Sequence, residues 1–211
     1  MVSPLERKKS PNPRQVALTA AMTAVTAVVT MITGSFVPFP ATGGYLNLGD
    51  SMVMLSGLLF GASLGGFAGG VGSALSDILL GYGYFAPLTL LIKGTEGYLV
   101  GLIGNSKSIS RKVAGVVTGA ITMLAGYFLV ETPLKGMGAA LGELVAINSI
   151  QVTVGAVVAL ALAQAVVKAY PELEFLRPKP QGLKAGVVVV VVAAVVLTAI
   201  VGTYLVTGIS P

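Results

Sequence analysis

The stretch Ala86–Asn105 reads APLTLLIKGTEGYLVGLIGN and combines an apolar span with two interior charges. Its length and apolar content suit a helix that crosses a bilayer core of about 30 Å, which takes roughly 20 residues. Pro87 is favourable in the first turn of such a helix. Lys93 and Glu96 fall inside the span, where a charge is costly, so both are candidates for a functional role.

The composition of the whole chain extends this conclusion. The 211 residues are 55% hydrophobic and only 10% charged, whereas a soluble domain carries about 25% charged residues. Mean hydropathy is +0.90, and 28 glycines supply the small residues that closely packed membrane helices need. We therefore expect an all-α integral membrane protein. The absence of Cys and His excludes disulfides, thiol nucleophiles and imidazole metal sites, and we expect no metal or cofactor.

Apolar stretches predict seven spans, at about Gln15–Gly34, Asp50–Phe60, Leu64–Gly81, Pro87–Asn105, Val113–Val130, Leu141–Lys168 and Ala185–Val206. The predicted domains are a basic leader over 1–14, a six-helix domain over 15–170, a polar linker over 171–184 and an additional transmembrane helix over 185–207. A signal peptide is an alternative for the first span, but its apolar stretch is longer than usual and no cleavage site follows promptly.

Ser35–Gly49 predicts a structured loop because it contains two Pro and three Gly residues. Asp50 directly after this loop is expected to cap the second helix.

The positions of Lys and Arg predict the orientation. With the N-terminus in the cytoplasm, eleven of the 13 basic residues fall in cytoplasmic segments, which is the positive-inside pattern. These residues are Arg7, Lys8, Lys9, Arg14, Lys107, Arg111, Lys112, Lys168, Arg177, Lys179 and Lys184. The pattern explains the net charge of +5 without nucleic acid. It predicts a multi-pass plasma-membrane protein with a cytoplasmic N-terminus and an extracellular C-terminus.

Several acidic residues lie in or beside the spans, on their predicted outward half, and each is a functional candidate by default. They are Asp50, Asp77, Glu96, Glu131 and Glu143. Lys93 and Glu96 share a helix face, where they either pair with each other or line a wet cavity. Tyr127 and Glu131 share a face of the fifth span.

Asn148 and Gln151 share a face of the sixth span. They either hold two helices together or read the hydrogen-bonding edges of a heterocycle. Asp77 either faces the same space or lies near the outer surface. Tyr45 and Asn47 in the first loop could cover such a cavity from outside, although an aromatic residue there is also a common interface anchor. Together these groups suit a small, planar, polar ligand better than a lipid or an inorganic ion.

Small residues recur at helical spacing in two places. Gly61–Gly72 reads GASLGGFAGGVG; it lacks the G-K-[ST] ending of a phosphate-binding loop, and its glycines four residues apart predict close helix contact. In the first span the alanines Ala17, Ala20, Ala21 and Ala24 have the same spacing and form a smooth packing surface.

Four motifs occur in order along the chain: GYLNLGDSMVMLSGLLFG (Gly44–Gly61), AGGVGSALSDILLGY (Ala68–Tyr82), AP-x-T-L-x-I-K-G-x-E-G (Ala86–Gly97) and E-L-x-x-x-N-x-x-Q-x-x-x-G-A (Glu143–Ala156). As a set they resemble the substrate-binding S components of energy-coupling factor (ECF) vitamin importers. The likeness covers about residues 14–170. It is greatest to the branch with riboflavin-type and hydroxymethylpyrimidine/thiamine-precursor-type members, with the pyrimidine type slightly favoured.

The resemblance implies a six-helix bundle that captures a water-soluble vitamin near the extracellular side and has no ATPase activity. It implies as partners a transmembrane coupling subunit (the ECF T component) and two ABC-type ATPases. Carried over by position, the ligand-binding residues are Asn47, Lys93, Glu96, Tyr127, Glu131, Asn148 and Gln151, and the partner-docking residues are Ala17, Ala20, Ala21 and Ala24. The seventh span departs from the six-helix unit.

Two other classes of function stay open at this point. A stand-alone secondary transporter could use Glu96 or Glu131 as a proton-coupling carboxylate, but no convincing internal repeat supports it. A small intramembrane enzyme lacks an obvious reaction centre, because the chain has no His, no Cys and no carboxylate cluster with metal-ligand spacing.

Overall fold

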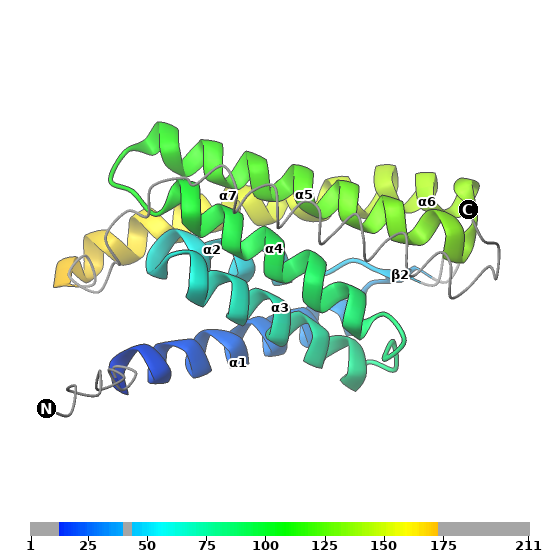
Figure 1. Cartoon of the computed structure of the whole chain (residues 1–211), viewed down its shortest axis with the longest axis horizontal. Helices are drawn as coiled ribbons and strands as arrows, with labels where there is room; N and C mark the ends of the chain where they lie inside the picture. The colour runs from blue at the N-terminus through cyan, green and yellow to red at the C-terminus, as the bar shows by residue number, and fades with distance from the viewer. Residues whose placement is uncertain (1–12, 40–43, 173–211) are drawn as a thin grey trace, which may run out of the picture.

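The computed structural model describes residues 13–39 and 44–172, and nearly all of them are helical (Figure 1). The elements in chain order are α1 (Pro13–Phe36), β1 (Pro38–Phe39), β2 (Gly44–Tyr45), α2 (Gly49–Phe60), α3 (Ala62–Leu79), α4 (Ala86–Gly104), α5 (Ile109–Lys135), α6 (Met137–Glu143), the π-helical segment η1 (Leu144–Asn148) and α7 (Ser149–Ala169). The first six predicted spans are thus helical, with ends within five residues of those expected. Most of the predicted leader and linker, and the whole additional helix over 185–207, lie outside the described residues.

The short helix α2 lies at the centre of the bundle. It contacts α1, α3, α4, α5 and α7, and ten of its twelve residues are buried. Met54 and Leu58 are fully buried and pack with Val100 of α4 and Met123 of α5 in the main hydrophobic core. At 1.5 Å per residue, α2 is only about 18 Å long, so it does not fill the full length of the bundle.

The start of α2 differs from the prediction. Leu48 occupies the N-cap position and makes no side-chain capping bond, while Asp50 lies within the first turn. The expected capping role of Asp50 is therefore wrong. Its carboxylate binds side chains of α4 and α7 instead, because a buried carboxylate gains more from a cation and an amide donor than from its own backbone.

Helices α3 and α4 pack closely through glycine, as the spacing of small residues predicted. A Cβ atom placed on Gly65 would lie 2.6 Å from the carbonyl oxygen of Gly97, and one on Gly69 would lie 2.8 Å from that of Lys93. Any larger residue at these positions would force the two backbones apart. This close contact fixes the depth and direction of Lys93 in α4.

Helix α1 has two different faces. Thr23, Thr26 and Thr30 are buried, and α1 packs against α3, where Ser76 donates a hydrogen bond of 2.9 Å to the carbonyl oxygen of Ala27. On the other side, four small residues are exposed: Ala17, Ala20, Ala21 and Ala24. The alanine surface is therefore not used within the described part of the bundle.

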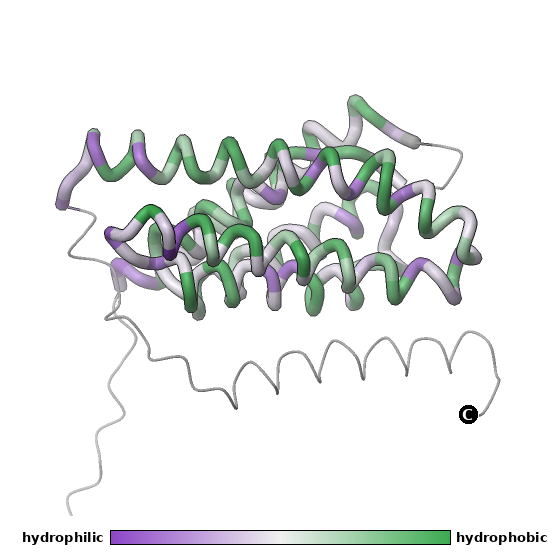
Figure 2. The backbone as a smooth tube through the Cα atoms, turned by 90° about the horizontal axis from the view of Figure 1, so that it is seen from above, coloured by the Kyte–Doolittle hydropathy of each residue, from purple (hydrophilic) through white to green (hydrophobic). Residues whose placement is uncertain are grey.

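The outer surface of the bundle is apolar. Three helical segments are long and apolar enough to cross a membrane: Pro13–Phe36, Ile109–Lys135 and Met137–Ala169. Hydrophobic residues run along the helices in Figure 2, and many large ones, among them Phe67, Ile78 and Val157, are exposed. Exposed apolar side chains along whole helices suit contact with lipid. These features agree with the expected all-α integral membrane protein.

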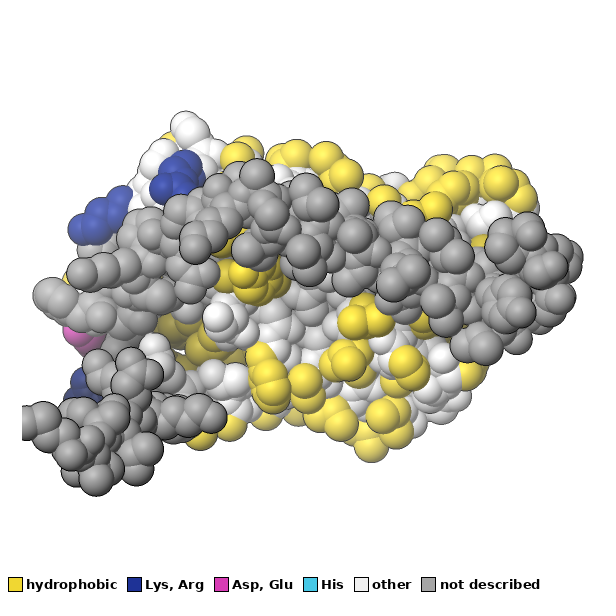
Figure 3. Space-filling model, viewed as in Figure 1, with side chains coloured by type: hydrophobic (Ala, Val, Ile, Leu, Met, Phe, Trp, Pro, Cys, Tyr) yellow, Lys and Arg dark blue, Asp and Glu magenta, His cyan; other side chains and the backbone are white. Residues whose placement is uncertain are grey.

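The two ends of the bundle differ in charge. Lys and Arg side chains gather at one end in Figure 3. The start of α1, the α4–α5 connection and the end of α7 meet at that end (Figure 1). The β1–β2 pair and the α5–α6 connection lie at the opposite end. The side of the membrane that each end faces stays a prediction.

Candidate ligand-binding site

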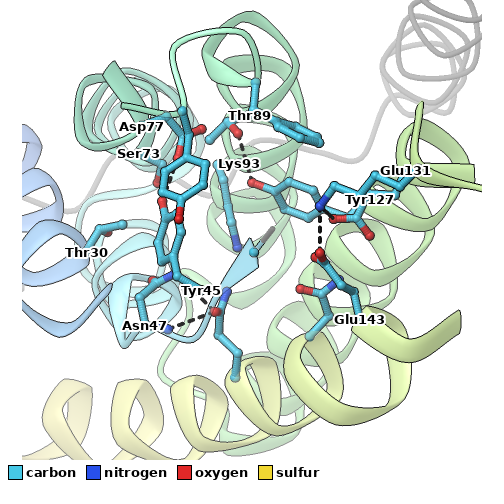
Figure 4. A pocket seen from close by; sticks show the side chains of 16 residues that line it. Thr30, Tyr45, Asn47, Ser73, Asp77, Thr89, Lys93, Tyr127, Glu131 and Glu143 are labelled. Carbon is cyan, nitrogen blue, oxygen red and sulfur yellow. Dashed lines mark hydrogen bonds and ion pairs between the residues drawn. The ribbon is translucent and has the colours of Figure 1, made fainter. Parts of the chain in front are cut away.

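A cavity of about 60 Å³ lies at the hairpin end of the bundle, beside the N-terminus of α2 (Figure 4). Since a cavity needs about 10–15 Å³ to hold one water, this space has room for more than one. The shortness of α2 leaves this part of the bundle centre to polar side chains from the surrounding elements. The lining residues are Thr30, Gly44, Tyr45, Asn47, Ser73, Asp77, Tyr82, Phe85, Thr89, Lys93, Tyr127, Glu131, Lys135, Glu143, Asn148 and Gln151.

Lys93 is at the centre of the polar network. Its ammonium group binds the carboxylate of Asp50 across the contact between α4 and α2, and it lies 3.1 Å from Oε2 of Glu96 on α4. All three side chains are at most 5% exposed. Removing charges from water costs several kcal/mol per ion, and their pairing offsets this cost only while every partner is present. The cluster therefore holds α2 and α4 in one arrangement.

Gln151 extends this network to α7 and to the loop before α2. Its Nε2 donates to Oδ2 of Asp50 at 3.0 Å, and its Oε1 accepts from the backbone N–H and from Nδ2 of Asn47, both at 3.0 Å. Oδ1 of Asn47 in turn accepts from the backbone N–H of Gly49 at 2.7 Å. This chain of bonds fixes both amides and ties the loop to three helices.

Two aromatic residues stand on opposite sides of Lys93 (Figure 4). Nζ of Lys93 lies 5.5 Å from the ring centroid of Tyr127, a cation–π distance, and the Tyr127 hydroxyl donates to Oγ1 of Thr89 at 3.1 Å. Tyr45 donates to Oδ1 of Asp77 at 2.5 Å. Burial, reinforced by the Asp77 carboxylate, raises the pKa of Tyr45 above its ordinary value, so its hydroxyl stays a hydrogen-bond donor.

A second charged cluster forms the wall between α5 and α6. Nζ of Lys135 lies 2.6 Å from Oε1 of Glu143 and 3.6 Å from Oε1 of Glu131, and 4.8 Å from the ring centroid of Phe85. A Cβ atom on Gly44 would lie 2.8 Å from both carboxylate oxygens of Glu143, so a larger residue at this point of the hairpin would displace the Glu143 carboxyl group.

The π-helical segment η1 places the side chains of α6 and α7 in the cavity. In a π-helix, residues five apart are hydrogen-bonded and therefore lie nearly above one another. Glu143 and Asn148 are five apart, and both line the cavity. The Ser149 hydroxyl donates to the carbonyl oxygen of Leu144 at 2.6 Å, which stabilises the wider turn.

Most of the residues selected from the sequence lie around this cavity. Six of the seven expected ligand-binding residues line it: Asn47, Lys93, Tyr127, Glu131, Asn148 and Gln151. Glu96 is fully buried, paired with Lys93 and absent from the lining. Asp77 faces the same space, which decides between the two positions that the sequence left open. A role of these residues in binding stays a prediction.

Several other lining residues were not predicted from the sequence. Lys135 lies beyond the expected end of the fifth span at Val130, but it is the last residue of α5 and pairs with two carboxylates. Nothing in the sequence around Thr89 and Phe85 indicates that they line a cavity, because this depends on residues that other helices place beside them. Among the described residues, no group of three or more acidic side chains is arranged to hold a metal ion.

Comparisons with known proteins agree with this architecture. Residues 10–168 match the family model described as ECF-type riboflavin transporter, S component. The chain is 30% identical over 143 residues to the thiamine precursor transporter HmpT of Lactococcus lactis subsp. cremoris, covering 66% of this chain and 82% of the relative. It is 50% identical over 108 residues to an uncharacterized protein of Pyrococcus woesei, covering 51% of this chain and 72% of the relative. The chain therefore belongs to the family of ECF-type riboflavin transporter S components, which are membrane transport proteins and not enzymes.

Proposed function

We propose that this chain is the substrate-capture subunit of an ECF-type importer and that it binds a hydroxymethylpyrimidine-type thiamine precursor in the cavity described above. The observation that carries the proposal is a polar cavity at one end of an apolar bundle, whose lining includes three side-chain amides, two ammonium groups and three tyrosines. Amides and carboxylates supply donors and acceptors for the edges of a nitrogen heterocycle. Tyr127 and Tyr45 supply flat apolar surface for its faces.

Two further observations favour a single-ring ligand. The relative HmpT is named as a thiamine precursor transporter, and a cavity of about 60 Å³ is closer in size to one ring than to the three fused rings of a flavin. The description of the matching family favours riboflavin as the second candidate.

In the proposed mechanism, the bundle captures its ligand without catalysis. The preformed network around Lys93, Gln151 and Asn47 keeps the polar groups in place before the ligand arrives. Binding therefore loses little side-chain conformational entropy. Uptake then requires the T component and two ABC-type ATPases. We assign their contact to the exposed alanine surface of α1, with the N-terminus in the cytoplasm and the cavity facing outward.

Native mass spectrometry of the detergent-purified protein tests the ligand. We expect a co-purifying pyrimidine in about one-to-one ratio, which is released and then identified. Release of a flavin would identify riboflavin as the ligand instead. An empty protein that also binds no vitamin from a panel would contradict the capture function. A liposome flux assay would then test gradient-driven transport by the chain alone.

A second experiment tests the docking surface. Ala21→Trp on α1 is expected to leave ligand binding unchanged and to abolish uptake in cells that contain the partner subunits. Ala161→Trp is the matched control, because Ala161 is an exposed alanine of α7. Normal uptake by the Ala21 variant would remove the docking assignment.

A further inference from the structure

The helical segment Met137–Ala169 is α-helical except at η1. There the backbone N–H of Ser149 donates to the carbonyl oxygen of Leu144, five residues earlier, and the Ser149 hydroxyl donates to the same oxygen at 2.6 Å. By contrast, the hydroxyls of Thr132 and Thr153 donate to carbonyl oxygens four residues earlier, as in a regular α-helix. A single wide turn of this kind is rare and is frequent at functional sites. It accommodates one residue more than a regular α-helix along the same path.

The extra residue determines which side of α6 faces the bundle. On that side lie Ala140 and Glu143, which are 0% and 3% exposed. An α-helix turns by about 100° per residue, so without the wide turn Glu143 would lie about 140° around the helix axis from Asn148. Leu144, four residues before Asn148, would then take the place of Glu143. Glu143 and Asn148 therefore line the same cavity because of η1.

A second, apolar face of α6 begins one residue further along the chain. Leu141 and Leu144 have the same spacing of three as Ala140 and Glu143, and Leu141 is 46% exposed while Leu144 is half-buried. A shift of register by one residue would exchange Ala140 for Leu141 and Glu143 for Leu144 against the bundle. The shift would restore regular four-residue hydrogen bonds and bury more apolar surface, which favours it. The same sequence thus supports two ways of packing α6.

Two contacts of Glu143 favour the observed register instead. Nζ of Lys135 lies 2.6 Å from its Oε1, and Gly44 of the hairpin lies directly against its carboxyl group. Both contacts are lost if Glu143 turns away. The helix α6 itself packs mainly against α5. At its start a Cβ atom on Gly136 or Gly138 would meet no atom within 4 Å, so the surroundings leave room for α6 to rotate.

We propose that α6 is a two-register switch. In the π register, which the structure shows, Ala140 and Glu143 face the bundle. In an α register Leu141 and Leu144 take their places, Glu143 leaves the cavity wall and Lys135 loses its nearest carboxylate. A one-residue shift has this effect because packed helices occupy discrete arrangements rather than a continuum. The consequence for capture rests on the proposed function: only the π register has the complete polar wall.

Cysteine labelling tests the two registers without any ligand. The chain contains no cysteine, so Ala140→Cys and Leu141→Cys each introduce a single thiol. The full chain in detergent is treated with N-ethylmaleimide, and the rate of labelling is measured for each variant. Because thiol reactivity follows exposure, we expect Leu141→Cys to react at least about tenfold faster than Ala140→Cys.

The same two reporters are then combined with Glu143→Ala. This change removes the carboxylate that favours the π register and adds no apolar side chain in its place. We expect the order of labelling to reverse, so that Ala140→Cys reacts faster than Leu141→Cys. The matched control is Glu172→Gln, which alters an exposed carboxylate and should preserve the original order.

Deletion of Val145 removes the extra residue itself. Val145 is 69% exposed, so few contacts are lost with it. The shortened segment can be α-helical throughout while Ala140 and Glu143 still face the bundle, since Glu143 then lies four residues before Asn148. We therefore expect the deletion variant to fold and to have one register only. Ala140→Cys should stay protected in it, even together with Glu143→Ala.

The outcomes distinguish this inference from the proposed function. An unchanged order of labelling in Glu143→Ala would overturn the switch. Reversal that persists after deletion of Val145, or a deletion variant that does not fold, would also overturn it, because the wide turn would then hold no spare residue. Binding is measured separately. A wild type that binds no vitamin would contradict the proposed function and leave the labelling result as it stands.

Discussion

Two lysine clusters in the bundle have the same composition and different surroundings. Each has one ammonium group and two carboxylates, and in each one carboxylate lies on the same helix as the lysine, three or four residues away. The Lys93 side chain is 5% exposed and its partners are fully buried, and through Gln151 the cluster reaches α7. The Lys135 side chain is 14% exposed, and its ion pairs join α5 and α6.

The difference shows that two similar clusters of charged side chains have different roles because they lie at different places in the bundle. The Lys93 cluster is surrounded by helices, so its ions stabilise one arrangement of α2, α4 and α7. The Lys135 cluster lies at the open end, and in it Oε2 of Glu131, a lining residue, has no partner among the described atoms. We therefore expect the first cluster to determine folding and the second to determine which ligand is bound.

The largest effect is expected for Lys93→Met. Removing the ammonium leaves Asp50 and Glu96 buried without their cation, which costs about 3–5 kcal/mol. The measurement is the thermal unfolding midpoint in detergent, which should fall sharply. The triple variant D50N/K93M/E96Q is expected to recover much of the loss, since it has no buried charge left to compensate. An unchanged midpoint in Lys93→Met would remove the distinction between the clusters.

Gln151→Leu tests whether the Lys93 cluster acts through its link to α7. The change leaves the amide of Asn47 and one oxygen of Asp50 without a partner, at about 1–3 kcal/mol for each unpaired group. We expect a clearly lower unfolding midpoint and weaker ligand binding. Gln164→Leu, at an exposed position of the same helix, is the control and should leave both unchanged. Equal behaviour of the two variants would mean that the network does not hold the loop.

Lys135→Met is expected to have a smaller effect on stability. Its removal leaves Glu131 and Glu143 without their cation, but the Lys135 side chain is 14% exposed against 5% for Lys93, so water at this end lowers the cost below the value expected for Lys93→Met. The unfolding midpoint should therefore fall much less than in Lys93→Met under the same conditions. A loss as large as that of the Lys93 variant would show that the outer cluster also organises the fold.

The smallest effect is expected for Tyr45→Phe, which removes the hydrogen bond to Asp77 and costs about 0.5–1.5 kcal/mol. Burial raises the pKa of Tyr45 from 10.0, so between that pH and its folded pKa only the unfolded chain ionises. The stabilisation by Tyr45 is therefore complete below about pH 10 and declines as the pH rises further. Unfolding midpoints from pH 8 to 11 should converge for the wild type and the variant. Curves that stay parallel would contradict this account.

Some contacts of the bundle could be predicted from the sequence, and others could not. The glycines of α3 were expected to allow close helix contact, and they do, because small residues at helical spacing act through local geometry. The pairing of Lys93 with Glu96 was one of two alternatives that their spacing of three left open, and the structure shows this pair. The stronger feature, the bond between Lys93 and Asp50, was not foreseen, and Asp50 was given a capping role that it does not have. Its partners lie on helices far along the chain.

The sequence by itself determined that this chain is a helical membrane protein, where its first six helices lie and which acidic residues are unusual. Hydropathy and residue spacing are local properties, so they can be read directly from the sequence. Only the tertiary structure decided which charges are satisfied and which atoms face the cavity. Those outcomes depend on contacts such as Lys93 with Asp50, 43 positions apart, and Gln151 with Asp50, 101 positions apart. Such pairs meet only when the helices pack, because no local rule brings them together.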